Sequence, residues 1–485
     1  WTLGAKSGGE IVVNTSELLE VIGGSGSGGF DTRMLVFVNE GAIGNGGDLT
    51  VKAGELLIKD GSYILTSTSG EGKGGDVNVT ANNIQVVGVT ADGSFFSNLS
   101  ASSNSGIGDA GNLNIITSEL LILDGGLVDT STTGKGRGGS LNITADRIQV
   151  IGEAAYGLFL SSGLESTTAF GTGDAGTLNI KTSELLVKDG GFVSVTTFSE
   201  GKAGNLNIAA DKVKVIGTSP FKEVSSLLLG ITENKGDAGK VSIKTGELLV
   251  EGGGQILANT RGGGKGGILD IEANKIQVIG RSTSSKNSFS LIDVRSATSA
   301  TGDAGELTID TNELLIQDGA SIITGTFSGG RGGKLTINAN NIELFGQSFD
   351  GRVSTLSSQA SSNATGNADS LTINTNTLLV QDGAQVSTGT FGRGNAGNLV
   401  VNADKLQVIG TSADGLTNSG LFSQTISEGN AGNLEINTQK LQLRDRARVS
   451  VESLGTGTAG NLTINARSIN LDNQGLLTAN TRSAA

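Results

Sequence analysis

Short stretches in which apolar and polar residues alternate recur along the whole chain. In residues 112–134, Leu113 and Ile115 flank a polar residue, and Leu120 and Ile122 follow with the same spacing. Alternation with a period of two predicts β-strands, and two turn sequences divide this stretch into three short ones. No stretch has the 3.6-residue period of an amphipathic helix, so the pattern predicts an all-β chain.

This three-strand pattern returns about every 64 residues. Each period opens on a turn of the Gly-Asp-Ala-Gly type, and a second glycine turn follows 28 residues later, as from Gly108 to Gly136. The spacing from the second turn to the next first turn varies from 35 to 38 residues. One half is therefore fixed in length, and the other carries a loop that tolerates insertion. After an irregular first coil over residues 1–43, the repeats start near residues 44, 108, 173, 236, 302, 366 and 429.

A fixed period of this kind indicates a solenoid, in which each unit buries its apolar face only against its neighbours. Three short strands in every turn predict a single-stranded parallel β-helix with about 15 coils, two in each 64-residue repeat. The right-handed form is expected, because right-handed crossovers are the default between parallel strands. We expect residues 1–485 to form one continuous β-helix, and we expect the chain to be a fragment of a longer one.

The composition removes most catalytic and metal chemistry. The chain has 78 glycines among 485 residues, no cysteine and no histidine, so it lacks thiolates and both the commonest general base and the commonest metal ligand. The formal net charge of −13 disfavours nucleic acid and anionic membranes as partners. No run of 18 apolar residues is present, so no membrane insertion is expected. We therefore predict no catalytic residue, no cofactor site, no metal site and no enzymatic activity.

Acidic residues recur in the first turn of the repeats. They could bind calcium, but they lie two coils apart, a distance of about 9.6 Å, which is too far for two of them to share one ion. We interpret them as turn residues whose carboxylates accept backbone N–H groups. These acids are Asp109, Asp174, Asp237 and Asp303.

Thr-x-Thr pairs occupy one position of the repeat in alternate coils. A flat outward array of such pairs could order water, as on ice-binding β-helices. The threonines lie an even number of residues from inward apolar residues of the same strand, however, so they point to the same side. We therefore predict an internal hydroxyl ladder. The pairs are Thr66/Thr68, Thr130/Thr132, Thr324/Thr326 and Thr388/Thr390.

The centre of the second strand carries leucine in six fixed halves and a polar residue in the variable halves. Strand alternation points this column away from the core. A leucine stripe is a candidate seam for lateral packing, although isolated exposed leucines are also common in soluble proteins. The candidate lateral-packing stripe consists of Leu57, Leu121, Leu186, Leu249, Leu315 and Leu379.

Aromatic residues are few and lie mostly in the loops of the variable halves. Such rings could stack on sugars, or they could fill the space under a loop. The loops are the best place to look for binding specificity because they alone vary in length. The loop set is Phe95, Phe96, Tyr156, Phe159, Phe221, Phe289, Phe349 and Phe422, and a second set at the rim of the glycine turns is Phe198, Phe327 and Phe391.

Two segments carry a resemblance to a known family: residues 394–403, which read Gly-Asn-Ala-Gly-Asn-Leu-Val-Val-Asn-Ala, and residues 459–466, which read Ala-Gly-Asn-Leu-Thr-Ile-Asn-Ala. They resemble the repeats of filamentous-haemagglutinin-type exoproteins, and the resemblance covers nearly the whole chain from about Gly8 onward. Those proteins are large right-handed β-helical surface proteins of Gram-negative bacteria, exported by two-partner secretion. The resemblance implies an extracellular or cell-surface location and a role in adhesion.

The leading functional hypothesis is an extracellular structural or adhesive β-helical stalk, or a filament-forming surface protein. Its expected partners are further copies of itself, through end-to-end or lateral association, and glycans or receptors of a host or neighbouring cell. The alternative is a polysaccharide-binding or polysaccharide-degrading β-helix protein, since many lyases and hydrolases have this fold. Ice binding is a third hypothesis.

Overall fold

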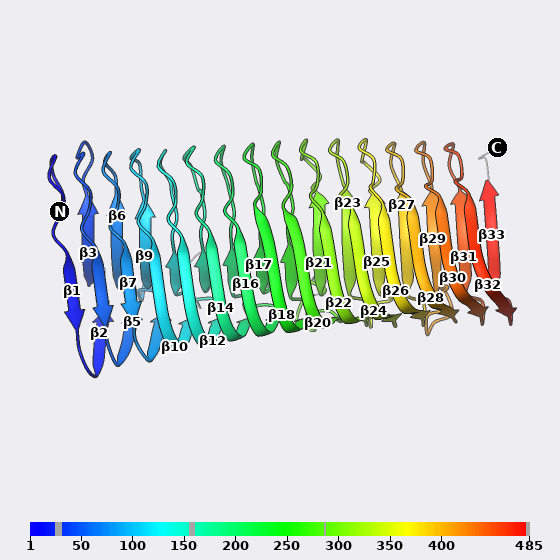
Figure 1. Cartoon of the computed structure of the whole chain (residues 1–485), viewed down its shortest axis with the longest axis horizontal. Helices are drawn as coiled ribbons and strands as arrows, with labels where there is room; N and C mark the ends of the chain where they lie inside the picture. Colours follow the sequence, from blue (N-terminus) through cyan, green and yellow to red (C-terminus); the bar gives the residue numbers. More distant parts are fainter. Residues whose placement is uncertain (25–31, 155–160, 286–287, 482–485) are drawn as a thin grey trace. The chain divides into compact units, whose positions relative to one another are not determined.

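The computed structural model describes residues 1–24, 32–154, 161–285 and 288–481. These residues form two compact units, Trp1–Thr245 and Gly246–Ala485. Every regular element among them is a β-strand, and the ladders between successive coils are parallel. Within each unit the coils follow one another side by side in sequence order (Figure 1). The predicted all-β parallel β-helix is confirmed.

In the first unit, the first and second strands of the coils belong to one sheet and the third strands to another. The first sheet contains β1 (Ile11–Asn14), β2 (Leu18–Ile22), β4 (Leu49–Lys52), β5 (Glu55–Lys59), β7 (Val77–Thr80), β8 (Asn83–Val87), β10 (Leu113–Leu123), β12 (Leu141–Ile151), β14 (Leu178–Lys188) and β16 (Leu206–Ile216). The third strands are β3 (Arg33–Val38), β6 (Tyr63–Thr68), β9 (Asn98–Ser103), β11 (Leu127–Asp129), β13 (Gly163–Glu165), β15 (Phe192–Ser194) and β17 (Leu227–Leu229). Strand β18 (Lys240–Glu251) crosses the boundary between the units.

The second unit has the same plan. Its first sheet contains β20 (Ile268–Ile279), β22 (Leu307–Gln317), β24 (Leu335–Phe345), β26 (Leu371–Gln381), β28 (Leu399–Ile409), β30 (Leu434–Arg444) and β32 (Leu462–Asp472). Its third strands are β19 (Gln255–Leu257), β21 (Leu291–Ser296), β23 (Ser321–Thr326), β25 (Thr355–Ala360), β27 (Gln385–Thr390), β29 (Gly420–Thr425), β31 (Arg448–Ser453) and β33 (Leu476–Thr481). The described chain contains 15 third strands, which agrees with the predicted number of coils.

The corner between the first and second strands is where the structure departs from three separate strands per coil. These strands are distinct in β4 and β5, but β10 runs through the corner as one 11-residue strand. Its register against β12 omits only Ser118, and the ladder resumes at the next residue. Thr117 lies beside Ala145 at the bend, and both are buried. Small inward residues let the backbone turn sharply at this corner, and the ladder is interrupted only at Ser118.

The core consists of columns in which the same residue type is stacked from coil to coil. Leu113 pairs with Leu141 and Leu141 pairs with Leu178, and each is completely buried. Ile115 and Ile143 form the neighbouring column and are at most 2% exposed. Burying each side chain of this size contributes about 1.5–3 kcal/mol against the chain entropy lost on folding.

The predicted internal hydroxyl ladder is also present. All eight threonines of the Thr-x-Thr pairs are at most 1% exposed. Thr68 donates its hydroxyl to the carbonyl of Gly72 at 2.6 Å, and Thr132 donates to Gly136 at 2.8 Å. The same bond ties the third strand to its glycine turn at Thr197, Thr260, Thr390 and Thr425. These hydroxyls therefore serve the interior and do not form an outward array.

The glycine turns stack so closely that no side chain fits between them. A Cβ atom placed on Gly136 would lie 1.9 Å from the carbonyl oxygen of Gly108, and one on Gly173 would lie 1.9 Å from that of Gly136. Real Cβ atoms do not approach a backbone oxygen so closely. Glycine is therefore required by the approach of neighbouring backbones, which explains why it recurs at both turns of every repeat.

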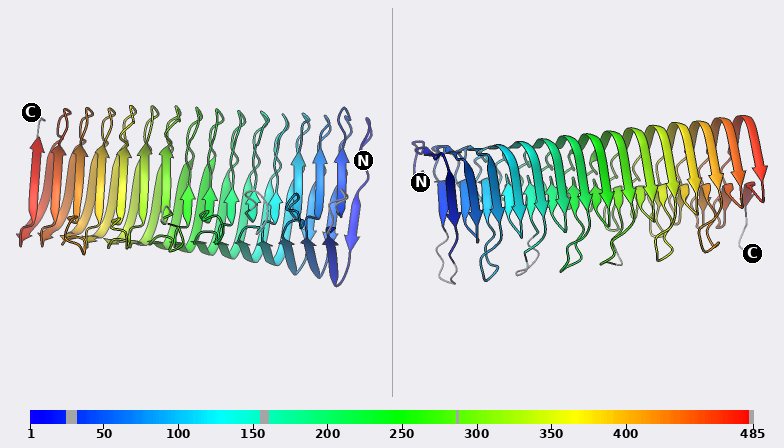
Figure 2. Two further views of the ribbon diagram at one scale, coloured as in Figure 1. Left: turned by 180° about the vertical axis from the view of Figure 1, so that it is seen from behind. Right: turned by 90° about the horizontal axis from the view of Figure 1, so that it is seen from below.

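The longer loops of the variable halves leave each unit on the side of the third strands (Figure 2). They connect the second strand to the third, as in residues 88–97 of the first unit and 346–354 of the second. Val89 and Phe96 close the first of these loops with an antiparallel bridge, and Gln347 and Val353 close the second. The loops therefore lie next to the outward face of the third strands.

Adjacent glycines in the second unit allow the steric requirement to be tested. We expect Gly330→Ala to lower the free energy of unfolding by about 3 kcal/mol or more, because its Cβ would lie 1.9 Å from the Gly302 oxygen. The control is Gly329→Ala, whose Cβ meets only Thr365 Oγ1, at 3.7 Å. Urea denaturation followed by circular dichroism would measure both. Equal stability of the two variants would contradict the stacking argument.

Candidate functional site

The acids of the first turns link neighbouring coils. The carboxylate of Asp109 accepts a hydrogen bond from the backbone N–H of Arg137 at 2.8 Å, and Asp303 accepts one from Arg331 at 2.8 Å. Each donor lies 28 residues further along the chain, in the next coil. The predicted role as acceptors of backbone N–H groups is confirmed for these acids, but the partner is the following coil. These carboxylates therefore act as structural rungs.

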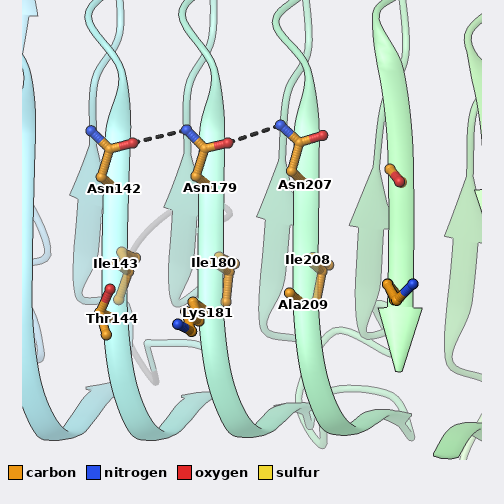
Figure 3. Close-up of a pocket in the computed structure, with 11 residues that line it drawn as sticks. Asn142, Ile143, Thr144, Asn179, Ile180, Lys181, Asn207, Ile208 and Ala209 are labelled. Atoms are coloured by element: carbon orange, nitrogen blue, oxygen red, sulfur yellow. Dashed lines mark hydrogen bonds between the residues drawn. The ribbon is translucent and has the colours of Figure 1, made fainter. Parts of the chain in front are cut away.

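Two columns of asparagine, one in each unit, form further rungs that the repeat pattern did not predict. Asn142 donates its Nδ2 to Asn114 Oδ1 at 2.9 Å, and Asn179 and Asn207 continue the column with bonds of 2.8 Å (Figure 3). The second column consists of Asn338, Asn374, Asn402, Asn437 and Asn465 and starts from Asp310. The recurring Leu-Asn-Ile and Thr-Ile-Asn sequences were the available signal. Because the amides bond to one another, we assign these columns a structural role.

The six leucines of the candidate lateral-packing stripe face outward and are half-buried. Leu121 lies between Gln85 and Gln149, and Leu186 lies between Gln149 and Lys214. In the second unit, Glu343 separates Leu315 from Leu379 in the same way. Leucines of the stripe thus occur in alternate coils, about 9.6 Å apart, with a long polar side chain between them. A partner that packs on the column must accommodate both kinds of residue.

A pair of carboxyl groups lies on the outward face of the third strands of the first unit. Asp129 on β11 is directly opposite Glu165 on β13, and Ser100 lies opposite Asp129 on its other side. Asp129 is only 6% exposed, and its Oδ1 has no hydrogen-bond partner among the described residues. Burial, together with the charge of Asp129, raises the pKa of Glu165 to about 8. Burial also raises the pKa of Asp129. The pair therefore holds a proton at neutral pH, because two adjacent carboxylates cannot both ionise readily.

The loops of successive repeats contact one another. In the first unit, the buried Glu153 carboxylate accepts hydrogen bonds from the backbone N–H groups of Phe221 (3.1 Å) and Lys222 (2.9 Å). In the second unit, Arg281 forms an ion pair with Asp350. Both contacts join residues 68 or 69 positions apart, which is about one repeat. In each unit, these contacts therefore link the loops of two successive repeats.

The predicted aromatic residues divide between exposed and covered positions. Phe95, Phe221 and Phe349 in the loops are exposed, and so is Phe198 at the rim. Half-buried rings are Phe96, Phe289, Phe327, Phe391 and Phe422. Tyr156 and Phe159 lie outside the described residues. The exposed loop rings are available to a ligand, whereas several of the others pack against neighbouring side chains.

Two rim phenylalanines of the second unit line a common groove of about 360 Å³. Phe327 and Phe391 follow the third strands of two coils that are separated by one intervening coil. The guanidinium carbon of Arg295 lies 4.7 Å from the centre of the Phe327 ring. The rest of the lining consists of Ile323, Thr326, Gln359, Ser361, Ser362 and Ile426. The groove thus combines ring faces with amide, hydroxyl and guanidinium groups, the mixture of groups that small-molecule sites use.

Comparison with known proteins gives no family: no family model and no curated protein matches the chain. Among the described residues, no helix is long and apolar enough to cross a membrane. The same residues contain no group of three or more acidic side chains that could hold a metal ion.

The carboxyl pair predicts how the stability of the fold depends on pH. Because the folded pKa of Glu165, about 8, exceeds its ordinary value of 4.5, its contribution to stability is complete below pH 4.5 and is lost as the pH rises through 8. We expect Glu165→Gln, which remains neutral, to remove this loss. The variant should match the wild-type chain at pH 5 and exceed it in stability at pH 9, as measured by urea midpoints.

Glu184→Gln is the control for this experiment. The hydrogen bond from Lys214 lowers the pKa of Glu184, so its contribution is present above its ordinary pKa and is lost as the pH falls. This variant should therefore lose stability at pH 9 relative to wild type. A Glu165→Gln variant with an unchanged pH profile would show that the pair does not hold a proton.

Proposed function

We propose that the chain is an extracellular structural module, a β-helical part of an adhesive stalk or surface filament. The observation that carries the proposal is the set of side-chain rungs that join neighbouring coils at the glycine turns and along the asparagine columns. Rungs of this kind hold neighbouring coils in one register, which suits a module that must stay extended under load. The resemblance to filamentous-haemagglutinin-type repeats supports the same function and location.

Association with further copies belongs to this proposal. The leucine stripe offers a half-apolar column at a regular spacing, and a second copy with the same spacing can match it over several coils. Glutamine and lysine side chains between the leucines, such as Gln149 and Lys214, can pair across such an interface. We infer lateral packing into bundles, with the loops beside the third strands left free.

Polysaccharide binding is a second candidate function, and the groove of the second unit favours it. Phe327 and Phe391 line this groove, and aromatic rings can stack on sugars. Gln359, Ser361 and Ser362 supply hydrogen-bonding groups between the rings. A structural module that displays such a groove is consistent with adhesion to a glycan-covered surface.

The location and the structural role can be tested together. Antibody raised against this segment should label fibres or a surface layer on intact source cells in electron microscopy. The label should be removed by an extracellular protease while an intracellular marker persists. Label found only in soluble secreted material, or only inside permeabilised cells, would contradict the proposal.

The lateral seam has its own test. We expect Leu121→Lys combined with Leu186→Lys to raise the concentration needed for bundling by about tenfold or more, because like charges would face each other across the seam. Light scattering and negative-stain microscopy would measure bundling, and thermal melting should be nearly unchanged because both side chains point outward. Ser183→Lys, at an exposed corner position outside the column, is the control and should have a smaller effect. Bundling that is insensitive to the leucine substitutions would exclude the stripe as the seam.

A further inference from the structure

A half-buried arginine without a carboxylate partner lies in the second unit. Arg352 belongs to the loop before β25, and its guanidinium carbon lies 3.5 Å from the centre of the Phe289 ring. Its Nη2 is 3.4 Å from Ser321 Oγ, and its buried Nε has no hydrogen-bond partner. Within the described part of the chain, Arg352 takes part in no ion pair. A buried charge is costly unless it is paired, so this position favours an anion.

The neighbouring arginines do not leave a carboxylate for Arg352. Arg295 binds Asp293 through Nε at 2.5 Å and through Nη2 at 2.7 Å. Arg281 is paired with Asp350. Burial, and then the charges of Arg295 and Arg281, lower the pKa of Arg352, which records both its partial desolvation and its closeness to the other two cations. The cluster of three arginines and two aspartates therefore carries one uncompensated positive charge.

The arginine cluster adjoins the aromatic groove. Arg295 belongs to both, because its side chain reaches from Asp293 to the face of Phe327. Arg352 contacts Ser321 at the start of β23, and Ile323, two residues further along this strand, lines the groove. One outward face of the third strands thus carries a cationic end and an aromatic groove.

The spacing of the rings matches a linear polymer that runs across the coils. The residues before Phe327 and Phe391 are Thr326 and Thr390, and both pair with Ala360 in the coil between them. The backbone positions that carry the rings are therefore two coil spacings apart, about 9.6 Å. This spacing is comparable to the length of one disaccharide in an extended chain. Alternate sugars could stack on the rings while the sugar between them contacts Ser361 and Gln359.

We propose that this face of the second unit binds an extended acidic polysaccharide, with sugar rings on Phe327 and Phe391 and a uronate carboxylate at Arg352. The proposal rests on the polysaccharide-binding function and specifies its ligand class. Arginine suits a carboxylate because its planar fork donates two parallel hydrogen bonds. An acidic peptide fits less well, because the backbone groups of the sheet are already paired within the ladders and leave none for a peptide main chain.

The test uses the full chain and a matched pair of ligands. Isothermal titration would compare an oligosaccharide of β-linked glucuronic acid with the same oligosaccharide after methyl esterification of its carboxyl groups. We expect the wild-type chain to bind the acid about tenfold or more tightly than the ester. Arg352→Gln should abolish this preference, and Arg352→Lys should retain part of it. Phe391→Ala should weaken the binding of both ligands.

Arg393→Gln is the matched control, because Arg393 is an exposed arginine of the same unit whose ion pair with Glu428 lies at the surface. It should leave the preference unchanged, and circular dichroism would verify that each variant is folded. If the wild-type chain bound the acid and the ester equally well and Phe391→Ala weakened both, the polysaccharide-binding function would stand. The anion site at Arg352 would then be overturned. Failure of both ligands to bind would overturn both proposals. Binding of poly-glutamate but neither sugar, with loss in Arg352→Gln, would reassign the site to an acidic peptide.

Discussion

The rest of this structure depends on the close contact between backbones at the glycine turns. At Gly136, Gly173 and Gly201 the space for a Cβ atom is occupied by the carbonyl oxygen of the preceding coil. Neighbouring coils can approach to the spacing of a parallel ladder only if both turns lack side chains. Once they do, the register of every strand in the coil is fixed, because the hydroxyl at Thr132 or Thr197 ties the third strand to the same turn. The core columns and the outward columns follow from that register.

Exact stacking has different consequences for different side chains. Leucine on leucine and asparagine on asparagine gain from it, since apolar surface is buried in the first case and amides bond to one another in the second. Like charges repel each other when they are stacked in this way. The acids in the turns therefore face a backbone N–H group instead of another acid. Asp129 and Glu165 are an exception, and the elevated pKa of Glu165 is the result. A charge that departs from the repeat therefore changes the chemistry of its neighbours.

The sequence was sufficient to predict most of the repeating features. The period, the inward columns such as Leu113 and Ile115, and the buried threonines follow from alternation and spacing, which are local properties. The continuous strand through the corner at Ser118 did not follow, because the turn-like sequence there gave no sign that the ladder would continue across it. To predict the asparagine columns, one must know that adjacent coils place equivalent positions of the repeat side by side. The leucine stripe was placed correctly on an outward column, but its packing role stays a prediction.

The groups that could bind a ligand or a proton were not predicted from the sequence, and the physical reason is the same for all of them. Asp129 and Glu165, or Arg295 and Arg352, meet only after loops of unequal length bring different coils into register, and no fixed spacing in the sequence identifies them. All four lie on the third strands or in the loops beside them. The other columns are constrained by stacking and hence repeat, whereas the third-strand face lies next to loops that vary. In a solenoid of this kind, individual chemistry is permitted where the repeat is interrupted, so the third-strand face is the place where one module can acquire a ligand that its neighbours lack.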